Sequence, residues 1–69
     1  MSFNFNYALM EHYERIDAAV EELADLWHLG VDVNDNDIYY KVLERNGLLN
    51  DGFTLDHDEI ARQVNRRLR

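Results

Sequence analysis

One apolar stripe runs through nearly a third of this chain. Between Leu9 and Trp27 large apolar side chains recur at alternating intervals of four and three residues. An α-helix turns by about 100° per residue, so this spacing keeps them on one narrow face. The stripe consists of Leu9, Tyr13, Ile16, Val20, Leu23 and Trp27. It predicts one long amphipathic helix over residues 7–29.

The ends of this first helix carry capping signals. Asn6 is suited to the N-cap position, where its side chain would accept a hydrogen bond from the first turn. Phe5 and Met10 then occupy the positions of a hydrophobic staple. Gly30 follows the last apolar residue and can adopt the left-handed conformation that ends many helices.

A second helix is predicted over residues 37–46. Asn34, Asp35 and Asn36 are alternative N-caps, and an apolar face follows them. Gly47 followed by Leu48 is typical of a Schellman ending, in which the second residue makes an apolar contact with the last turn.

A third helix is predicted over residues 57–68. Asp56 as N-cap and Glu59 three residues later form a capping box. Ile60, Val64 and Leu68 then share one face of this helix. The chain has no proline. It also has no cysteine, so no disulfide can join the three helices and they must hold together by packing alone.

These signals predict an all-α fold: a small three-helix domain, with residues 1–69 as one domain. Phe3, Asn4 and Phe5 alternate apolar and polar side chains, which suits either a short strand or an extended arm. We expect an extended N-terminal arm, because no second strand is evident for pairing. A chain of 69 residues buries only about 60% of its unfolded surface, so its core is thin.

Acidic and basic residues are unevenly distributed along the chain. All fourteen Asp and Glu residues precede Ile60, together with three bases, whereas the last ten residues hold four arginines and no acid. The net charge is −7. A surface this negative repels nucleic acid and attracts cationic proteins. We therefore expect a larger basic protein or protein complex as the partner, and no direct binding of nucleic acid.

The acids of the first helix lie opposite its apolar stripe. By helix spacing only Glu11 has a cation partner, Arg15. Three more acids follow in the next connection, and Tyr39 and Tyr40 are adjacent, so one of them must be exposed as a possible anchor. The predicted partner-binding residues are Glu14, Glu21, Glu22, Asp25, Asp32, Asp35, Asp37, Tyr39 and Tyr40. The alternative is a solvated face that only keeps the protein soluble.

In size, in acidity and in its lack of a catalytic motif the chain resembles small acidic inhibitors of phages and mobile elements, including DNA-mimic anti-restriction and anti-CRISPR proteins. The resemblance is one of type and carries no matching motif. It implies an inhibitor or regulator that occupies a basic groove of its partner, including a groove that binds nucleic acid.

Two other functions stay open. The chain could be a helical self-assembly module, a homodimer in which the basic end of one copy meets the acidic helix of the other. It could also be a small nucleic-acid-binding regulator, because Asp58–Gln63 resembles a helix of helix-turn-helix proteins. That regulator would use the C-terminal arginines Arg62, Arg66, Arg67 and Arg69. We expect no recognition helix after Arg69, and DNA readout needs one.

The remaining motifs argue against a metal site, a cofactor, an enzymatic activity and a membrane span. His12, His28 and His57 have no metal-ligand spacing and are expected at the surface or its boundary, so no metal and no cofactor is predicted. The run Asp32–Asp37 lacks the glycine and glutamate of a calcium loop. One serine, one lysine and no cysteine leave no nucleophilic constellation, so no enzyme is expected. We expect a cytoplasmic protein without a membrane span or a secretion signal.

Overall fold

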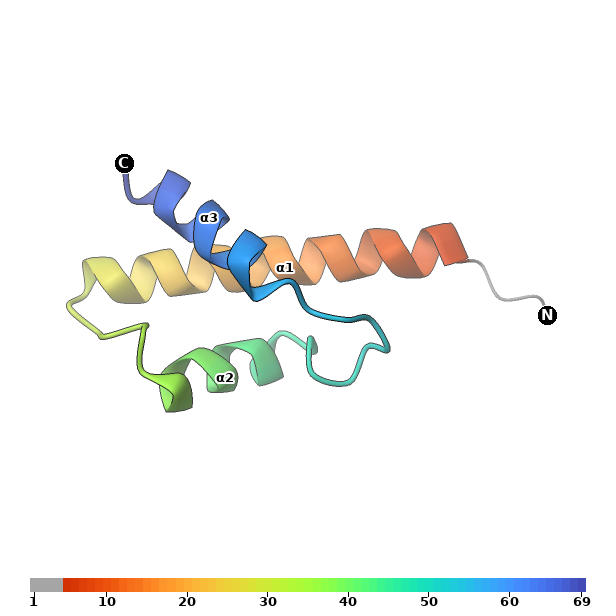
Figure 1. Ribbon diagram of the computed structural model, residues 1–69, viewed down its shortest axis with the longest axis horizontal. Coiled ribbons are helices and arrows are strands. Elements are labelled where there is room, and N and C mark those ends of the chain that lie inside the picture. The colour runs from red at the N-terminus through yellow and green to blue at the C-terminus, as the bar shows by residue number, and fades with distance from the viewer. Residues whose placement is uncertain (1–4) are drawn as a thin grey trace.

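The computed structural model describes residues 5–69, which form three helices and no strand. The elements are α1 (Phe5–His28), α2 (Asn36–Arg45) and α3 (His57–Arg67). The prediction of a small all-α domain with three helices is confirmed (Figure 1). The predicted N-terminal arm falls mainly on residues 1–4, which lie outside the described residues, and Phe5 is already helical.

The start of α1 differs from the prediction and its end agrees with it. Asn6 lies inside the helix, so it is not the N-cap, and the staple of Phe5 and Met10 is wrong by the same shift. The Phe5 ring instead lies 5.9 Å from the ring of Phe53, a tertiary contact that helix spacing does not reveal. Gly30 has a φ of +86° and ends α1 as expected.

The core lies where α2 and α3 meet α1. Both shorter helices pack on α1 and their backbones do not contact each other. Leu48 is buried, and its N–H donates to the Leu43 carbonyl at 3.0 Å, which confirms the Schellman ending of α2. The buried cluster consists of Ile16, Ala19, Val20, Leu23, Val42, Leu43, Leu48, Ile60 and Val64.

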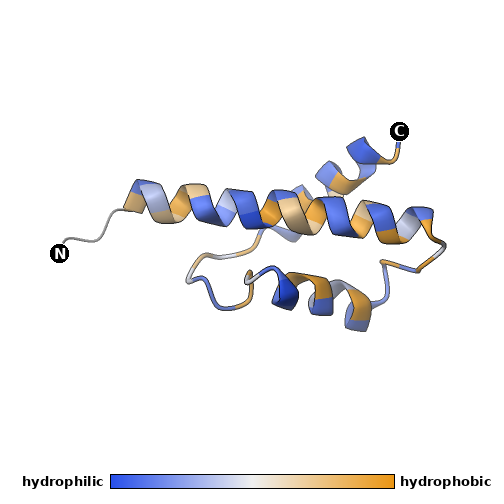
Figure 2. Cartoon of the chain, turned by 180° about the vertical axis from the view of Figure 1, so that it is seen from behind, coloured by the Kyte–Doolittle hydropathy of each residue, from blue (hydrophilic) through white to orange (hydrophobic). Residues whose placement is uncertain are grey.

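The apolar stripe of α1 is buried only in its middle. Tyr13 is 60% exposed and Trp27 is 47% exposed, although both lie on the predicted stripe. Both side chains line open surface pockets beside residues of α3 and are only partly covered. The N-terminal part of α1 is left uncovered because α1 has 24 residues, whereas α2 and α3 have 10 and 11. At 1.5 Å per residue, α1 is about 36 Å long and the others are about 15 Å, so they cannot cover it. Figure 2 shows hydrophobic residues recurring along all of α1, including the part beyond its neighbours.

Side-chain caps begin both short helices. Asp35 accepts a hydrogen bond from the Asp37 N–H at 2.9 Å and so starts α2. Asp56 accepts one from the Glu59 N–H at 3.0 Å and so starts α3, as predicted. The N-caps of the two short helices are therefore readable from the sequence.

Replacing the α3 cap, Asp56→Ala, is expected to lower the free energy of unfolding by about 1 kcal/mol, because the Glu59 N–H loses its acceptor. Asp58→Ala is the control: it also removes a carboxylate from the first turn of α3, but no cap. It should cost only a few tenths of a kcal/mol through the helix dipole. Urea denaturation of both variants followed by circular dichroism measures the difference, and equal losses would contradict the assigned cap.

Candidate docking surface on the first helix

The predicted acidic face forms on α1. Glu14, Asp17, Glu21 and Asp25 are all exposed, while the opposite side of the helix is buried in the core. The helical repeat sets this arrangement, because positions three, four and seven residues apart stay on one side. The four carboxylates therefore lie on a single rigid element. We call these four residues the acidic face.

Each of the two neighbouring helices contributes one arginine that forms an ion pair with an acid of α1. Arg67 of α3 contacts the Asp17 carboxylate and lies 3.9 Å from Glu21. Arg45 of α2 contacts Glu22 at the flank of the face. The prediction that only one acid has a cation partner is wrong, because these arginines lie far away in the sequence.

The flanks of α1 are thus neutralised more than its centre. Glu22 also accepts a 3.2 Å hydrogen bond from the Asn46 amide, and Glu11 lies 3.6 Å from Arg15 as helix spacing predicted. Within residues 5–69, neither Glu14 nor Asp25 is part of an ion pair. The acidic face keeps four carboxylates against the single guanidinium of Arg67, so it stays negative.

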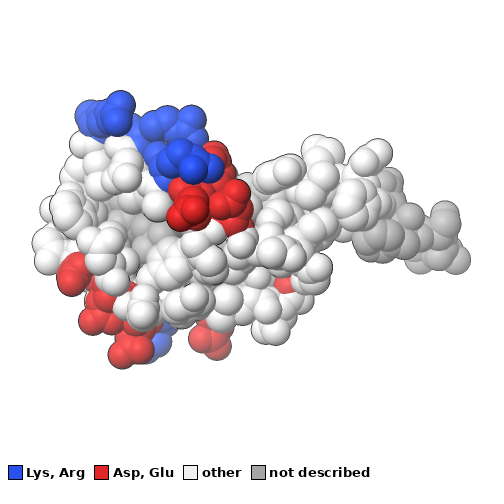
Figure 3. All heavy atoms as spheres, in the orientation of Figure 1, with Lys and Arg blue, Asp and Glu red and all other residues white. Residues whose placement is uncertain are grey.

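The acids of the connection between α1 and α2 have local structural roles. Asp32 accepts a hydrogen bond from the Asn34 N–H at 3.0 Å, and Asp35 is the N-cap of α2. Asp37 lies in the first turn of α2, where a negative charge suits the helix dipole. All three remain exposed. Figure 3 shows acidic side chains gathered at the end of the molecule where this connection and α2 lie.

One of the two adjacent tyrosines is exposed, as predicted, although their rings contact each other with centroids 5.3 Å apart. Tyr39 packs against the core, and its hydroxyl is hydrogen-bonded to His57 Nδ1 at 2.7 Å. Burial, followed by the charge of Tyr40, raises the pKa of Tyr39 to about 12, so its hydroxyl stays protonated at neutral pH. Tyr40 is exposed and is the one available as an anchor.

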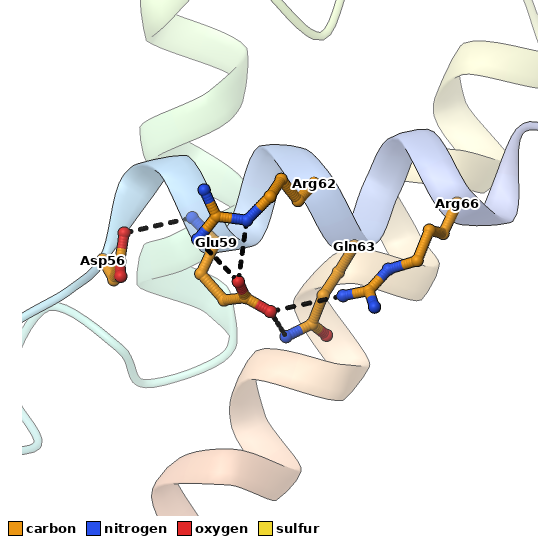
Figure 4. Close-up of polar contacts among 5 residues, drawn as sticks. All are labelled: Asp56, Glu59, Arg62, Gln63 and Arg66. Carbon is orange, nitrogen blue, oxygen red and sulfur yellow. Dashed lines mark hydrogen bonds and ion pairs between the residues drawn. The ribbon is translucent and has the colours of Figure 1, made fainter.

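Most of the arginines at the basic end of the chain form ion pairs with acids of the same chain. Glu59 accepts hydrogen bonds from Arg62 at 2.7 and 3.0 Å and from Gln63 and Arg66 at 3.2 Å (Figure 4). The hydrogen bonds from Arg62 and then Gln63 lower the pKa of Glu59, and the Glu59 hydrogen bond raises that of Arg62. In a capping box the Glu59 side chain would also accept a hydrogen bond from the backbone N–H of Asp56. It does not, because its carboxylate is turned toward these side chains.

This geometry bears on the alternative nucleic-acid site. Arg62 and Arg66 face Glu59, and Arg67 faces α1, so each already has an intramolecular carboxylate partner. Only Arg69 of the predicted set has no ion pair within the part of the chain that the structure describes. The arginines are brought together at the C-terminal half of α3, but mainly as partners of this chain's own acids.

Sequence reasoning missed a buried polar cluster. His12 was expected near the surface, yet its side chain is 6% exposed and its Nδ1 lies 2.5 Å from Asp51 Oδ2, whose side chain is 2% exposed. The Phe53 N–H donates to Asp51 at 3.1 Å, and Arg15 lies 3.8 Å away. A signal existed, because His12 is four residues before Ile16 and so falls on the core side of α1.

The cluster sets the charge state of its carboxylate. Burial alone would raise the pKa of Asp51. The hydrogen bonds from His12 and the Phe53 N–H, with the charges of His12 and Arg15, outweigh burial and lower the pKa below its ordinary value of 3.8. The ionised Asp51 thus ties the turn before Phe53 to α1. Its role is structural, because the pair is enclosed.

Across residues 5–69, no group of three or more metal-binding side chains comes together, and no helix is both long and apolar enough to cross a membrane. No protein-family model matches the chain, and neither the curated proteins nor the solved structures give a match. The surface chemistry of the helices is therefore the basis for any functional proposal.

Proposed function

We propose that this chain is a small protein-binding inhibitor or regulator that docks on a basic surface of a larger partner. The observation that carries the proposal is the acidic face, whose four exposed carboxylates meet only one guanidinium. The face lies on a continuous helix of 24 residues, so binding needs no reordering of the backbone. Cations of a partner would find carboxylates already positioned.

The spacing of the acids supports a partner that normally binds nucleic acid. The four carboxylates of the acidic face follow one another at intervals of three or four residues, about one helical turn of 5.4 Å. This is of the same order as the roughly 3.4 Å rise between successive phosphates along one DNA strand. Exposed ion pairs such as Arg67 with Glu21 contribute little, so a partner's cations can replace them. This favours an inhibitor of the DNA-mimic type found among anti-defence proteins of phages.

Charge reversal on the acidic face tests the proposal. The double variant Glu21→Lys with Asp25→Lys changes the centre of the face by four charges. The matched control, Glu44→Lys with Asp58→Lys, makes the same change at exposed positions of α2 and α3. Each protein is immobilised and exposed to an extract of the organism that encodes the chain, and retained proteins are identified by mass spectrometry.

We expect the wild type and the control to retain the same protein with a basic surface, and the face variant to retain at least tenfold less of it. Release should occur as salt rises from 0.1 to about 0.5 M, because salt screens exposed charges. Equal retention by all three proteins would overturn docking through the acidic face. Retention of acidic proteins only would overturn the proposed partner class.

A further inference from the structure

The N-terminal part of α1 extends beyond the helices that cover the rest of it. Figure 1 shows this part projecting past α2 and α3, and Figure 3 shows that its surface on the face drawn is almost free of charged side chains. We infer that this projecting part is a self-association surface, and that it pairs with the same part of a second copy in antiparallel orientation. This inference is independent of the proposed docking function.

Large apolar side chains surround the projecting helix. Phe5, Tyr7, Met10 and Tyr13 are between 57% and 62% exposed. At 100° per residue they spread over more than half of the helix circumference. A helix that is apolar on most sides is usually buried by other protein. Among residues 5–69, the Phe53 ring approaches this part of the helix through contacts with the rings of Phe5 and His12.

The charge distribution favours a second copy of this chain as the binding partner of the projecting part. Two molecules with a net charge of −7 repel each other wherever their acids face. The first ten residues hold no charged side chain, although 30% of the chain is charged. This segment is therefore where two copies can approach with least repulsion, and its apolar side chains supply the attraction.

The same argument selects the antiparallel orientation. In a parallel pair, Glu11 and Glu14 of the two copies would lie beside each other, and so would the two acidic domains. An antiparallel pair that crosses near Leu9 and Met10 sends the domains in opposite directions. It also places Glu14 beside the first turn of the partner's α1, which contains no acid and carries the positive end of the helix dipole.

The available area sets the strength of the pair. Aromatic side chains bury about 150–250 Å² each when fully covered, so four large side chains exposed to this degree offer roughly 500 Å² per copy. Because these side chains spread over more than half of the helix, two copies would bury at most about 1,000 Å², at the low end for specific interfaces. A reversible dimer with a dissociation constant of about 10–500 μM is therefore expected.

Sedimentation equilibrium between about 10 μM and 1 mM tests the inference. The wild-type mass should rise from 8.2 kDa toward twice that value. The variant Met10→Lys with Tyr13→Lys should stay monomeric, and both positions are exposed, so its fold should persist. The control, Leu29→Lys with Tyr40→Lys, adds the same charge at exposed apolar positions elsewhere and should associate as the wild type does.

Salt distinguishes this surface from the acidic face. Raising salt from 50 to 500 mM should strengthen the dimer several-fold, because it screens the repulsion between two chains of like charge. Docking through the acidic face should weaken instead. The variant at Glu21 and Asp25 should dimerise at least as well as the wild type, so either proposal can fail without the other.

Disulfide formation tests the orientation, because the chain has no cysteine of its own. Mixing Asn6→Cys with Tyr13→Cys protein should give mainly the mixed disulfide, since these positions oppose each other in the antiparallel pair. Disulfides joining Asn6→Cys only to itself would indicate a parallel pair and overturn the orientation. A wild type that stays monomeric at 1 mM, or dimers of the Met10 and Tyr13 variant, would overturn the surface itself.

Discussion

Replacing Leu23 by alanine is expected to lower the free energy of unfolding by about 3 kcal/mol. Leu23 is 2% exposed and lies in the C-terminal half of α1, in the buried cluster that α2 and α3 form with it. The substitution leaves a cavity in the one cluster that joins all three helices. A domain of 69 residues has a total stability of roughly 3–10 kcal/mol, so much of it would be lost.

Tyr13→Ala is the matched control, because Tyr13 belongs to the same sequence stripe but lies outside the core. It should cost less than about 1 kcal/mol. Urea unfolding of both variants at low micromolar concentration, where self-association is negligible, gives the comparison. Similar losses for Leu23 and Tyr13 would contradict the observed end of the core.

Asp51→Ala is expected to lower the free energy of unfolding by about 3 kcal/mol, because it removes one partner of a buried pair. The variant would leave the enclosed His12 ring without its acceptor and the Phe53 N–H without a carboxylate. Asp32→Ala is the control, since Asp32 also accepts a backbone hydrogen bond but is exposed. It should cost about 1 kcal/mol or less.

The same pair predicts a pH dependence. The pKa of Asp51 is lower in the folded protein than its ordinary value of 3.8, so folding favours the ionised carboxylate. The contribution is complete above about pH 4 and is lost as the pH falls through the lowered pKa. The stability difference between the wild type and Asp51→Asn should therefore shrink between pH 4 and pH 2. A constant difference over this range would contradict the lowered pKa.

The features predicted correctly from the sequence are local. The cap Asp56, the cap Asp35 as one of three predicted alternatives, and the glycine endings at Gly30 and Gly47 depend on contacts within about five residues of the chain. Helix spacing also placed the acids of α1 opposite its core. These signals are strong because backbone geometry alone fixes them.

The features that sequence reasoning missed depend on tertiary packing. The spacing of the apolar residues in α1 does not reveal how much of the stripe the shorter helices cover. Arg67 and Asp17 are 50 residues apart, and His12 and Asp51 are 39 apart, so no helical spacing links them. Asn6 failed as a cap because α1 already includes Phe5, two residues before the predicted start, and the Phe5 ring contacts that of Phe53.

These corrections change the candidate site in a specific way. The acids that sequence reasoning treated as one continuous band divide into flanks with close arginine partners and a centre where Arg67 alone approaches, at 3.9 Å from Glu21 among residues 5–69. Glu22 belongs to a flank, because Arg45 and Asn46 both bind it. Glu21 and Asp25 lie nearer the centre, and they are the positions where charge reversal should affect a partner most.

The most direct measurement is the affinity of the purified partner for this chain at two salt concentrations. For the wild type, and for the Glu44 and Asp58 control, the dissociation constant should rise at least tenfold between 50 and 300 mM salt. For the Glu21 and Asp25 variant it should already be at least tenfold higher at 50 mM and respond little to salt. The same dissociation constant for all three proteins at both salt concentrations would contradict docking through the acidic face.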